Sequence, residues 1–153
     1  MIVEVPDAFF KDVKKQFNEL DTSTVDEQMK DMLDYFKTSP CLFDVVPRWS
    51  CAGHSKESGD DSFYIIFCTI GDGAEFLLSV FDEISKRMME RFGTGYLACT
   101  RLTIVNLLHQ NHPGTHNHLK LETMTQGDPV LTTAIKKVWF EVLDELTWEY
   151  YES

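Results

Sequence analysis

The stretch at residues 48–70, RWSCAGHSKESGDDSFYIIFCTI, joins a polar segment directly to the most apolar run of the chain. That run, residues 63–68, carries large hydrophobic side chains at successive positions, so both of its faces need to be buried. A strand buried on both faces lies in the interior of a sheet. We therefore expect a central strand here, preceded by a polar loop at residues 50–61 that lies close to the core.

Size and charge limit the fold and the class of partner. The chain has 153 residues, of which 43% are hydrophobic, and this suits a single domain over residues 1–153. It carries 25 Asp and Glu against 14 Lys and Arg, a formal net charge of −11. Because this charge repels phosphate backbones and anionic membranes, we expect neither direct nucleic-acid binding nor membrane binding. The charge favours a basic protein as partner.

Cysteine usage and the first residues predict a cytoplasmic protein. The four cysteines are scattered, and two of them fall inside apparent strands. The opening sequence MIVEVP lacks the basic and apolar regions of a signal peptide. The longest apolar runs are far shorter than the roughly twenty residues that span a bilayer. We expect a reduced, cytosolic protein without a transmembrane segment.

Two helices and a strand are expected at the N-terminal end. Apolar residues recur at helical spacing in two successive segments, and the second begins at a capping box formed by Thr24 and Glu27. These helices are predicted to form a hairpin over residues 6–38. A first strand is expected over residues 41–46, ended by Pro47.

The rest of the chain repeats one pattern. Two strand-strand-helix units are predicted, over residues 41–93 and 95–150, and each second strand leads to a Gly-Asp helix start. The apolar stripe that begins at Leu77 matches the stripe that begins at Ile135 at one constant offset. The other expected elements are strands over 62–70, 96–108 and 116–125, helices over 72–93 and 128–146, and a loop over 109–115.

These elements predict an α+β fold. Strands joined by short connections pair antiparallel, so the two units are expected to form a four-stranded antiparallel sheet with two helices on one face, in a connectivity that suits a ferredoxin-like permutation. Alternation along the last strand predicts Leu119 and Leu121 inward and His118 outward. The N-terminal hairpin is expected to cap a sheet edge, to cover part of the second face, or to face a partner.

Cysteine and histidine side chains form a candidate zinc site. Thiolate and imidazole groups are ligands that zinc prefers, and two groups of them are predicted at the ends of neighbouring strands. The candidate ligands are Cys51, His54, His109, His112, His116 and His118. Histidines around a Pro-Gly turn are also common as solvated loop residues, so both interpretations stay open.

Two further hypotheses concern the polar segment. Cys51 would act as a nucleophile with a histidine base, although the acidic field of the protein favours the protonated thiol. Glu57, Asp60 and Asp61 would bind a hard cation, although carboxylates in such loops are also usual turn formers.

The last helix ends in an acidic and aromatic sequence. After Lys137 the chain has several carboxylates and no basic residue. Negative charge at a helix C-terminus opposes the macrodipole by roughly a few tenths of a kcal/mol per group, and a basic partner surface would compensate. The candidate partner-binding residues are Glu141, Asp144, Glu145, Trp148, Glu149 and Tyr151. A solvated acidic helix end is the alternative.

In size and acidity the chain resembles the small inhibitory proteins that phages make against host enzymes, including those that imitate DNA. We therefore expect a non-enzymatic binding module without a cofactor, an inhibitor or adaptor for a basic protein, and a homodimer is compatible with it. The alternative is a small zinc-dependent hydrolase with the cysteine and histidine site described above.

Overall fold

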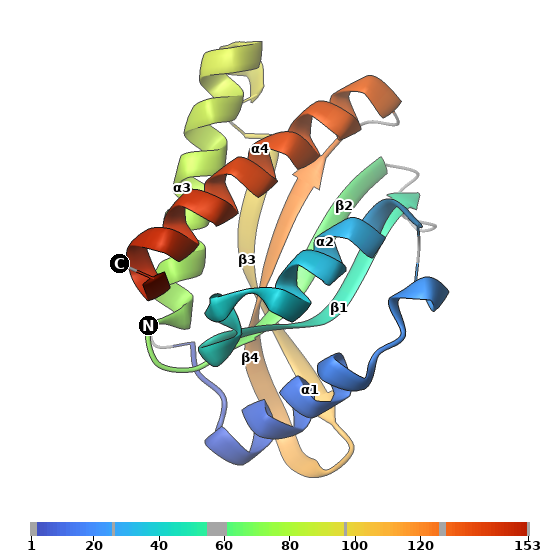
Figure 1. The fold of residues 1–153 in the computed structure, drawn as a ribbon, viewed down its shortest axis with the longest axis vertical. Helices are drawn as coiled ribbons and strands as arrows, with labels where there is room; N and C mark the ends of the chain where they lie inside the picture. The colour runs from blue at the N-terminus through green and yellow to red at the C-terminus, as the bar shows by residue number, and fades with distance from the viewer. Residues whose placement is uncertain (1–2, 26, 55–60, 97, 126–127, 153) are drawn as a thin grey trace.

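The computed structural model describes residues 3–25, 27–54, 61–96, 98–125 and 128–152, with the backbone alone at 27–28, 49, 51–54, 61–62 and 152. The helices are α1 (Asp7–Glu19), α2 (Glu27–Thr38), α3 (Gly73–Phe92) and α4 (Pro129–Thr147). The strands are β1 (Val45–His54), β2 (Asp61–Thr69), β3 (Thr100–His109) and β4 (His112–Met124). Short 3-10 turns precede α2, β1 and β3, and a π-helical turn, Trp148–Glu152, follows α4 (Figure 1).

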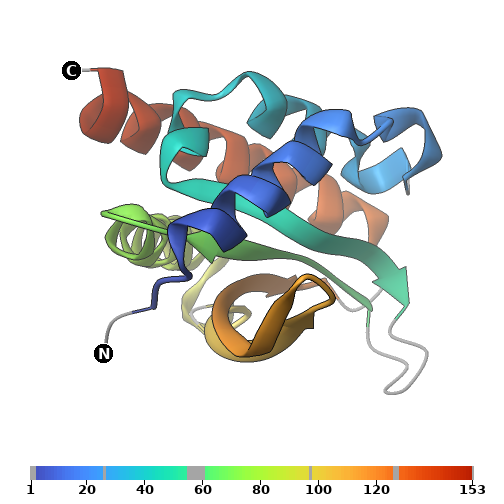
Figure 2. The same cartoon turned by 90° about the horizontal axis from the view of Figure 1, so that it is seen from below.

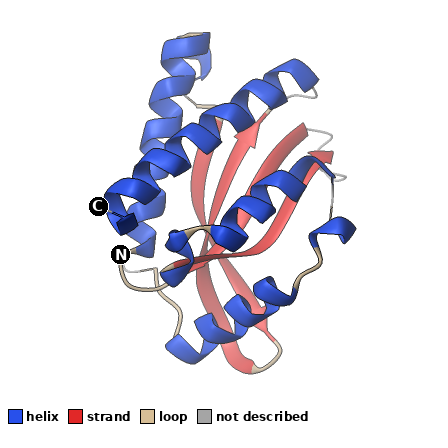
Figure 3. Ribbon diagram, in the orientation of Figure 1, coloured by secondary structure: helices blue, strands red, loops and turns tan. Residues whose placement is uncertain are grey.

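The strands form one antiparallel sheet in the order β1-β2-β4-β3, which confirms the predicted α+β class (Figure 3). The central pair has the symmetry of a duplicated unit. Tyr64 on β2 pairs with Glu122 on β4, and the offset between these two residues is the one that relates Leu77 to Ile135. The pseudo-two-fold axis therefore passes through this pair.

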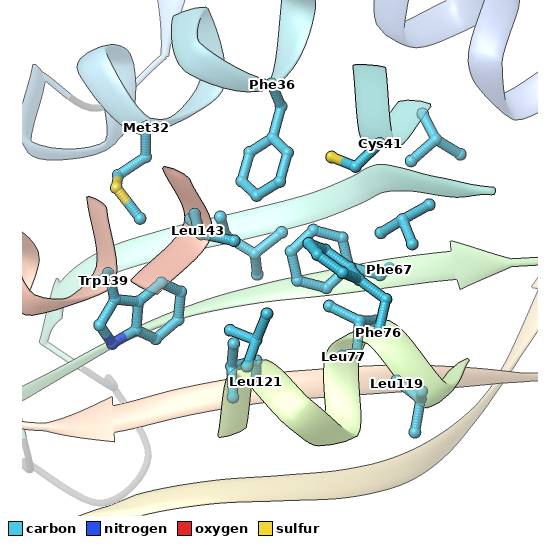
Figure 4. Close-up of a cluster of buried hydrophobic side chains, with 14 of the residues drawn as sticks. Met32, Phe36, Cys41, Phe67, Phe76, Leu77, Leu119, Leu121, Trp139 and Leu143 are labelled. Atoms are coloured by element: carbon cyan, nitrogen blue, oxygen red, sulfur yellow. The ribbon is translucent and has the colours of Figure 1, made fainter. Parts of the chain in front are cut away.

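Three helices share one face of the sheet and enclose the main core. The ring of Phe36 from α2 lies 5.3 Å from that of Phe67 on β2, and the indole of Trp139 from α4 lies 4.7 Å from Phe63. Helix α3 adds Phe76 and Leu77 to the same cluster, which Figure 4 shows. The buried Trp139 indole N–H donates to Thr123 Oγ1 at 2.9 Å, so this large side chain leaves no unpaired donor.

Helix α1 packs on the opposite face. His118 and Leu119 are neighbours on β4, so their side chains lie on opposite faces. Leu119 points into the cluster beneath α2, α3 and α4, whereas the His118 ring lies 5.6 Å from Phe9 of α1. The two N-terminal helices therefore straddle the edge strand β1, with α1 over the second face and beside the curled β3–β4 hairpin (Figure 2).

The first strand begins later and runs further than the sequence predicts. Residues 40–43 form a 3-10 turn, and β1 continues through Pro47 into the segment that was expected to be a loop. Proline is tolerated because β1 lies at the sheet edge, and the register shifts between Pro47 and Trp49 as in a β-bulge. The described part of the polar segment is thus an edge strand, and residues 55–60 lie outside the described chain.

The histidine segment also differs from what the sequence predicts. The expected loop at 109–115 belongs largely to β3 and β4, which extend to a tight turn between His109 and His112. His118, predicted to face outward, is fully buried because α1 covers that face. The alternation correctly places the side chains of His118 and Leu119 on opposite faces of the sheet, but helices cover both faces.

The start of α3 requires a close approach of two backbones. A Cβ at Gly73 would lie 2.3 Å from the backbone oxygen of Asp44, which already accepts the Ile70 N–H at 2.9 Å. The carbonyl is therefore held in place and cannot retreat from an added methyl group.

We expect Gly73→Ala to destabilise the protein by about 1–3 kcal/mol, as overpacking does, although alanine normally stabilises a helix interior by about 1 kcal/mol. The free energy of unfolding from urea titration measures this. Gly95→Ala is the matched control, because nothing lies within 4 Å of its added Cβ. Equal effects of the two substitutions would contradict the steric explanation.

Candidate functional site

The acidic end of α4 is partly neutralised by α3. Arg91 donates to Glu141 at 2.6 Å, and Arg87 lies 3.6 Å from the same carboxylate. Arg87 also pairs with Glu145 on α4 and, at 3.0 Å, with Glu83 on its own helix. Arg91 holds the pKa of the Glu141 carboxyl below its usual range. Two of the predicted partner-binding carboxylates therefore bind α3.

The aromatic residues at this end divide into two groups. The Tyr151 ring packs 5.4 Å from Phe76, and its hydroxyl donates to Asp44 at 3.4 Å, so Tyr151 joins the end of α4 to the core. Trp148 has 61% of its surface exposed. Asp144, Glu149 and Tyr150 are also exposed beside it in sequence. Trp148, Asp144 and Glu149 are thus exposed members of the predicted set.

A small polar pocket adjoins this surface. It has a volume of about 150 Å³ and lies between the end of α2 and the end of α4. Its lining residues are Tyr35, Thr38, Ser39, Pro40, Asp144 and Thr147. A carboxylate, hydroxyl groups and the C-terminal end of a helix all favour a cationic group in such a pocket.

A second group of candidate residues lies around Phe9 of α1. The centroid of its ring is 5.0 Å from that of His109, 5.2 Å from His112 and 4.6 Å from His116. The guanidinium of Arg48, on β1, lies 5.2 Å from the same centroid. We call these five side chains together with His118 the Phe9 cluster. It joins α1 and β1 to the β3–β4 hairpin.

His118 is held as a neutral imidazole. Its Nδ1–H donates to the His116 carbonyl at 2.8 Å, and Nε2 accepts from Arg48 at 2.8 Å. Burial lowers its pKa to about 4, and the positive charge of Arg48 acts in the same direction. Burial also lowers the pKa of His109. His112 Nε2 lies 2.7 Å from an Asp12 carboxylate oxygen on α1.

The two predicted groups of metal ligands do not come together. The backbone of His54 pairs with Asp61 at one end of the sheet, whereas the histidine hairpin extends beyond the opposite end. The side chains of Cys51 and His54 lie outside the described part of the structure. Among the side chains that are described, no three metal-ligating groups are arranged to hold an ion.

The roles of Phe9 and Arg48 are not visible in the sequence. Phe9 belongs to an ordinary helical apolar stripe, and Arg48 begins a polar segment. The one available signal was the concentration of four of the five histidines between residues 109 and 118. Their neighbour α1 is distant in sequence, and nothing in the pattern identifies it.

No protein-family model, curated protein or solved structure significantly matches this chain. Within the described residues, no helix is both long and apolar enough to cross a bilayer. The function of the candidate sites is therefore inferred from their geometry and charge alone.

We expect the free energy of unfolding to decrease as the pH falls below about 6.5. The pKa of His118 is lowered to about 4 in the folded protein, so the unfolded chain binds the proton first and is favoured between these two values. Stability from the neutral imidazole is complete above pH 6.5 and is lost towards pH 4. One pH unit below 6.5 corresponds to about 1 kcal/mol.

Urea titrations at pH 7.5 and 5.5 test this expectation, with His118→Gln as the comparison. The variant should be less stable at pH 7.5 but should lose less stability on acidification, because it lacks the titrating group. Identical pH dependence in both proteins would show that His118 does not titrate as described.

Proposed function

We propose that the protein is a binding module that presents the end of α4 to a basic partner protein. The observation that carries the proposal is the exposure of Trp148, at 61%, beside Asp144 and Glu149. Aromatic residues are enriched at protein interfaces and contribute a large share of binding energy. An exposed indole among carboxylates suits a partner that brings Arg or Lys side chains.

The pocket beside Asp144 supports the same partner chemistry. Its volume of about 150 Å³ suits the end of one extended basic side chain, and Asp144 would supply the opposite charge. The indole of Trp148 would stack on a second cation. The net charge of −11 would attract such a partner over a longer range, and this attraction would weaken with salt.

An inhibitor or adaptor of this type needs only one localised surface. The DNA-mimicking special case is less well supported, because it requires unpaired carboxylates along a whole face. Glu141 and Glu145 instead pair with Arg87 and Arg91. The proposed contact surface comprises the exposed residues Asp144, Trp148 and Glu149, with the adjoining pocket.

Binding to a basic protein captured from a lysate and then purified tests the proposal. We expect Trp148→Ala to weaken the complex by about 30-fold, since loss of an interface tryptophan costs about 2 kcal/mol. The double variant Asp144→Asn, Glu149→Gln should weaken it by about 10-fold at low salt and by less at high salt. Isothermal titration calorimetry gives both values.

The matched control is Glu4→Gln, Asp7→Asn, which removes the same charge from two exposed positions near α1. We expect it to change affinity less than two-fold. If the control weakens the complex as much as the double variant does, binding depends only on net charge. If Trp148→Ala has no effect, the proposed surface is wrong.

A further inference from the structure

The two edges of the sheet differ in how they are covered. Beside β1, helices α1 and α2 lie on either face of the strand. At the other edge, β3 has no further strand beside it in the part of the chain that the structure describes. Ile104 and Leu108 on β3 are 40% and 67% exposed, Asn106 is exposed between them, and Thr103 is exposed next to Ile104. Natural proteins seldom leave so long an apolar edge strand open to solvent.

Hydrogen bonding determines which backbone groups of β3 face outward. Met124 N–H donates to the Cys99 carbonyl at 2.9 Å, so these two residues form a hydrogen-bonded antiparallel pair. Because such pairs alternate with pairs whose groups point away, the outward N–H and C=O groups belong to alternate residues of β3. They are those of Thr100, Leu102, Ile104, Asn106 and Leu108.

One of these outward groups already has a partner. The side chain of Arg48 donates to the carbonyl oxygen of Leu108. The part of the edge that remains open within β3 therefore centres on Ile104, with Leu102 on one side and Asn106 on the other.

The same hairpin is the least acidic part of the protein. No Asp or Glu occurs from residue 91 to residue 121, although the chain has 25 of them. Arg101 and Lys120 are the basic residues of β3 and β4. Elsewhere, two copies with a net charge of −11 each would bring carboxylates together. At β3 they would meet without bringing carboxylates together.

We propose that two copies of the chain associate through β3 as an antiparallel pair centred on Ile104. Ile104 then pairs with Ile104 of the second copy, and Leu102 pairs with Asn106 of that copy, reciprocally. In this register the outward groups of all three residues become hydrogen-bonded, and the exposed Ile104 side chains pack together across the two-fold axis. The result is a continuous eight-stranded sheet.

Arg48 disfavours a register centred on Asn106. In the proposed register Leu108 lies only at the end of the paired segment, opposite Thr100. A pair centred on Asn106 would place Leu108 opposite Ile104, next to the two-fold axis, and would require the Leu108 carbonyl that Arg48 occupies. The proposal is independent of the acidic surface on α4, which belongs to a different element. It follows that a dimer would carry two copies of that surface.

Analytical ultracentrifugation of the full chain over 1–200 µM tests the proposal. We expect a concentration-dependent dimer in the wild type and a monomer in Ile104→Lys. Asn106→Pro should also be monomeric and still folded, because it removes only an outward N–H and leaves the pairing with β4 intact. Val130→Lys, at an equally apolar position that is 79% exposed on α4, is the matched control and should still dimerise.

Disulfide crosslinking tests the register. Ile104→Cys should form a covalent dimer on mild oxidation, since directly paired residues have a Cα separation of about 5.5 Å. Leu108→Cys, on the same strand and face, should crosslink no more than the wild type does. A monomeric wild type at 200 µM, a dimer that survives both Ile104→Lys and Asn106→Pro, or equal crosslinking at the two positions would overturn the proposal.

Discussion

Strand β2 is buried on both of its faces, and the placement of the other elements follows from this requirement. Phe63, Ile65 and Phe67 face the layer of α2, α3 and α4, whereas Ile66 and Cys68 lie on the opposite face. Each large side chain fully removed from water contributes roughly 1.5–3 kcal/mol, so neither face can be left open. The duplicated unit supplies helices for one face only. Helix α1 provides the cover for the other.

This division explains which parts of the fold could be predicted from the sequence. Successive apolar residues from Phe63 to Cys68 identify a central strand, and the matched stripes at Leu77 and Ile135 identify the repeated helices. Both signals are local. The position of α1 depends on residues that are distant in sequence. The apolar stripe that contains Phe9 shows that one side of the helix is buried, but it does not show against which surface. The buried His118 was predicted to be exposed for the same reason.

The candidate sites show a similar limit. A count of carboxylates identifies the acidic end of α4, but the pairing of Glu141 with Arg91 depends on two helices lying side by side. Tyr151 also looks like an interface residue in the sequence, whereas it packs against Phe76. Pro47 was predicted to end the first strand because proline has no backbone N–H to donate to a neighbouring strand. This constraint does not apply at a sheet edge, where the missing N–H has no partner to lose.

The position of α1 has a consequence for the order in which the molecule assembles. The contact of Asp12 with His112 spans 100 residues of chain, so α1 leaves the ribosome long before the β3–β4 part of its binding surface has been synthesised. Phe9 at its N-terminal end must remain without its histidine neighbours until the β3–β4 hairpin forms, and contacts of such long range slow folding. The contacts of Phe9 are thus among the last in the fold to be completed. During translation the exposed phenylalanines of α1 are a natural substrate for chaperones that bind nascent chains.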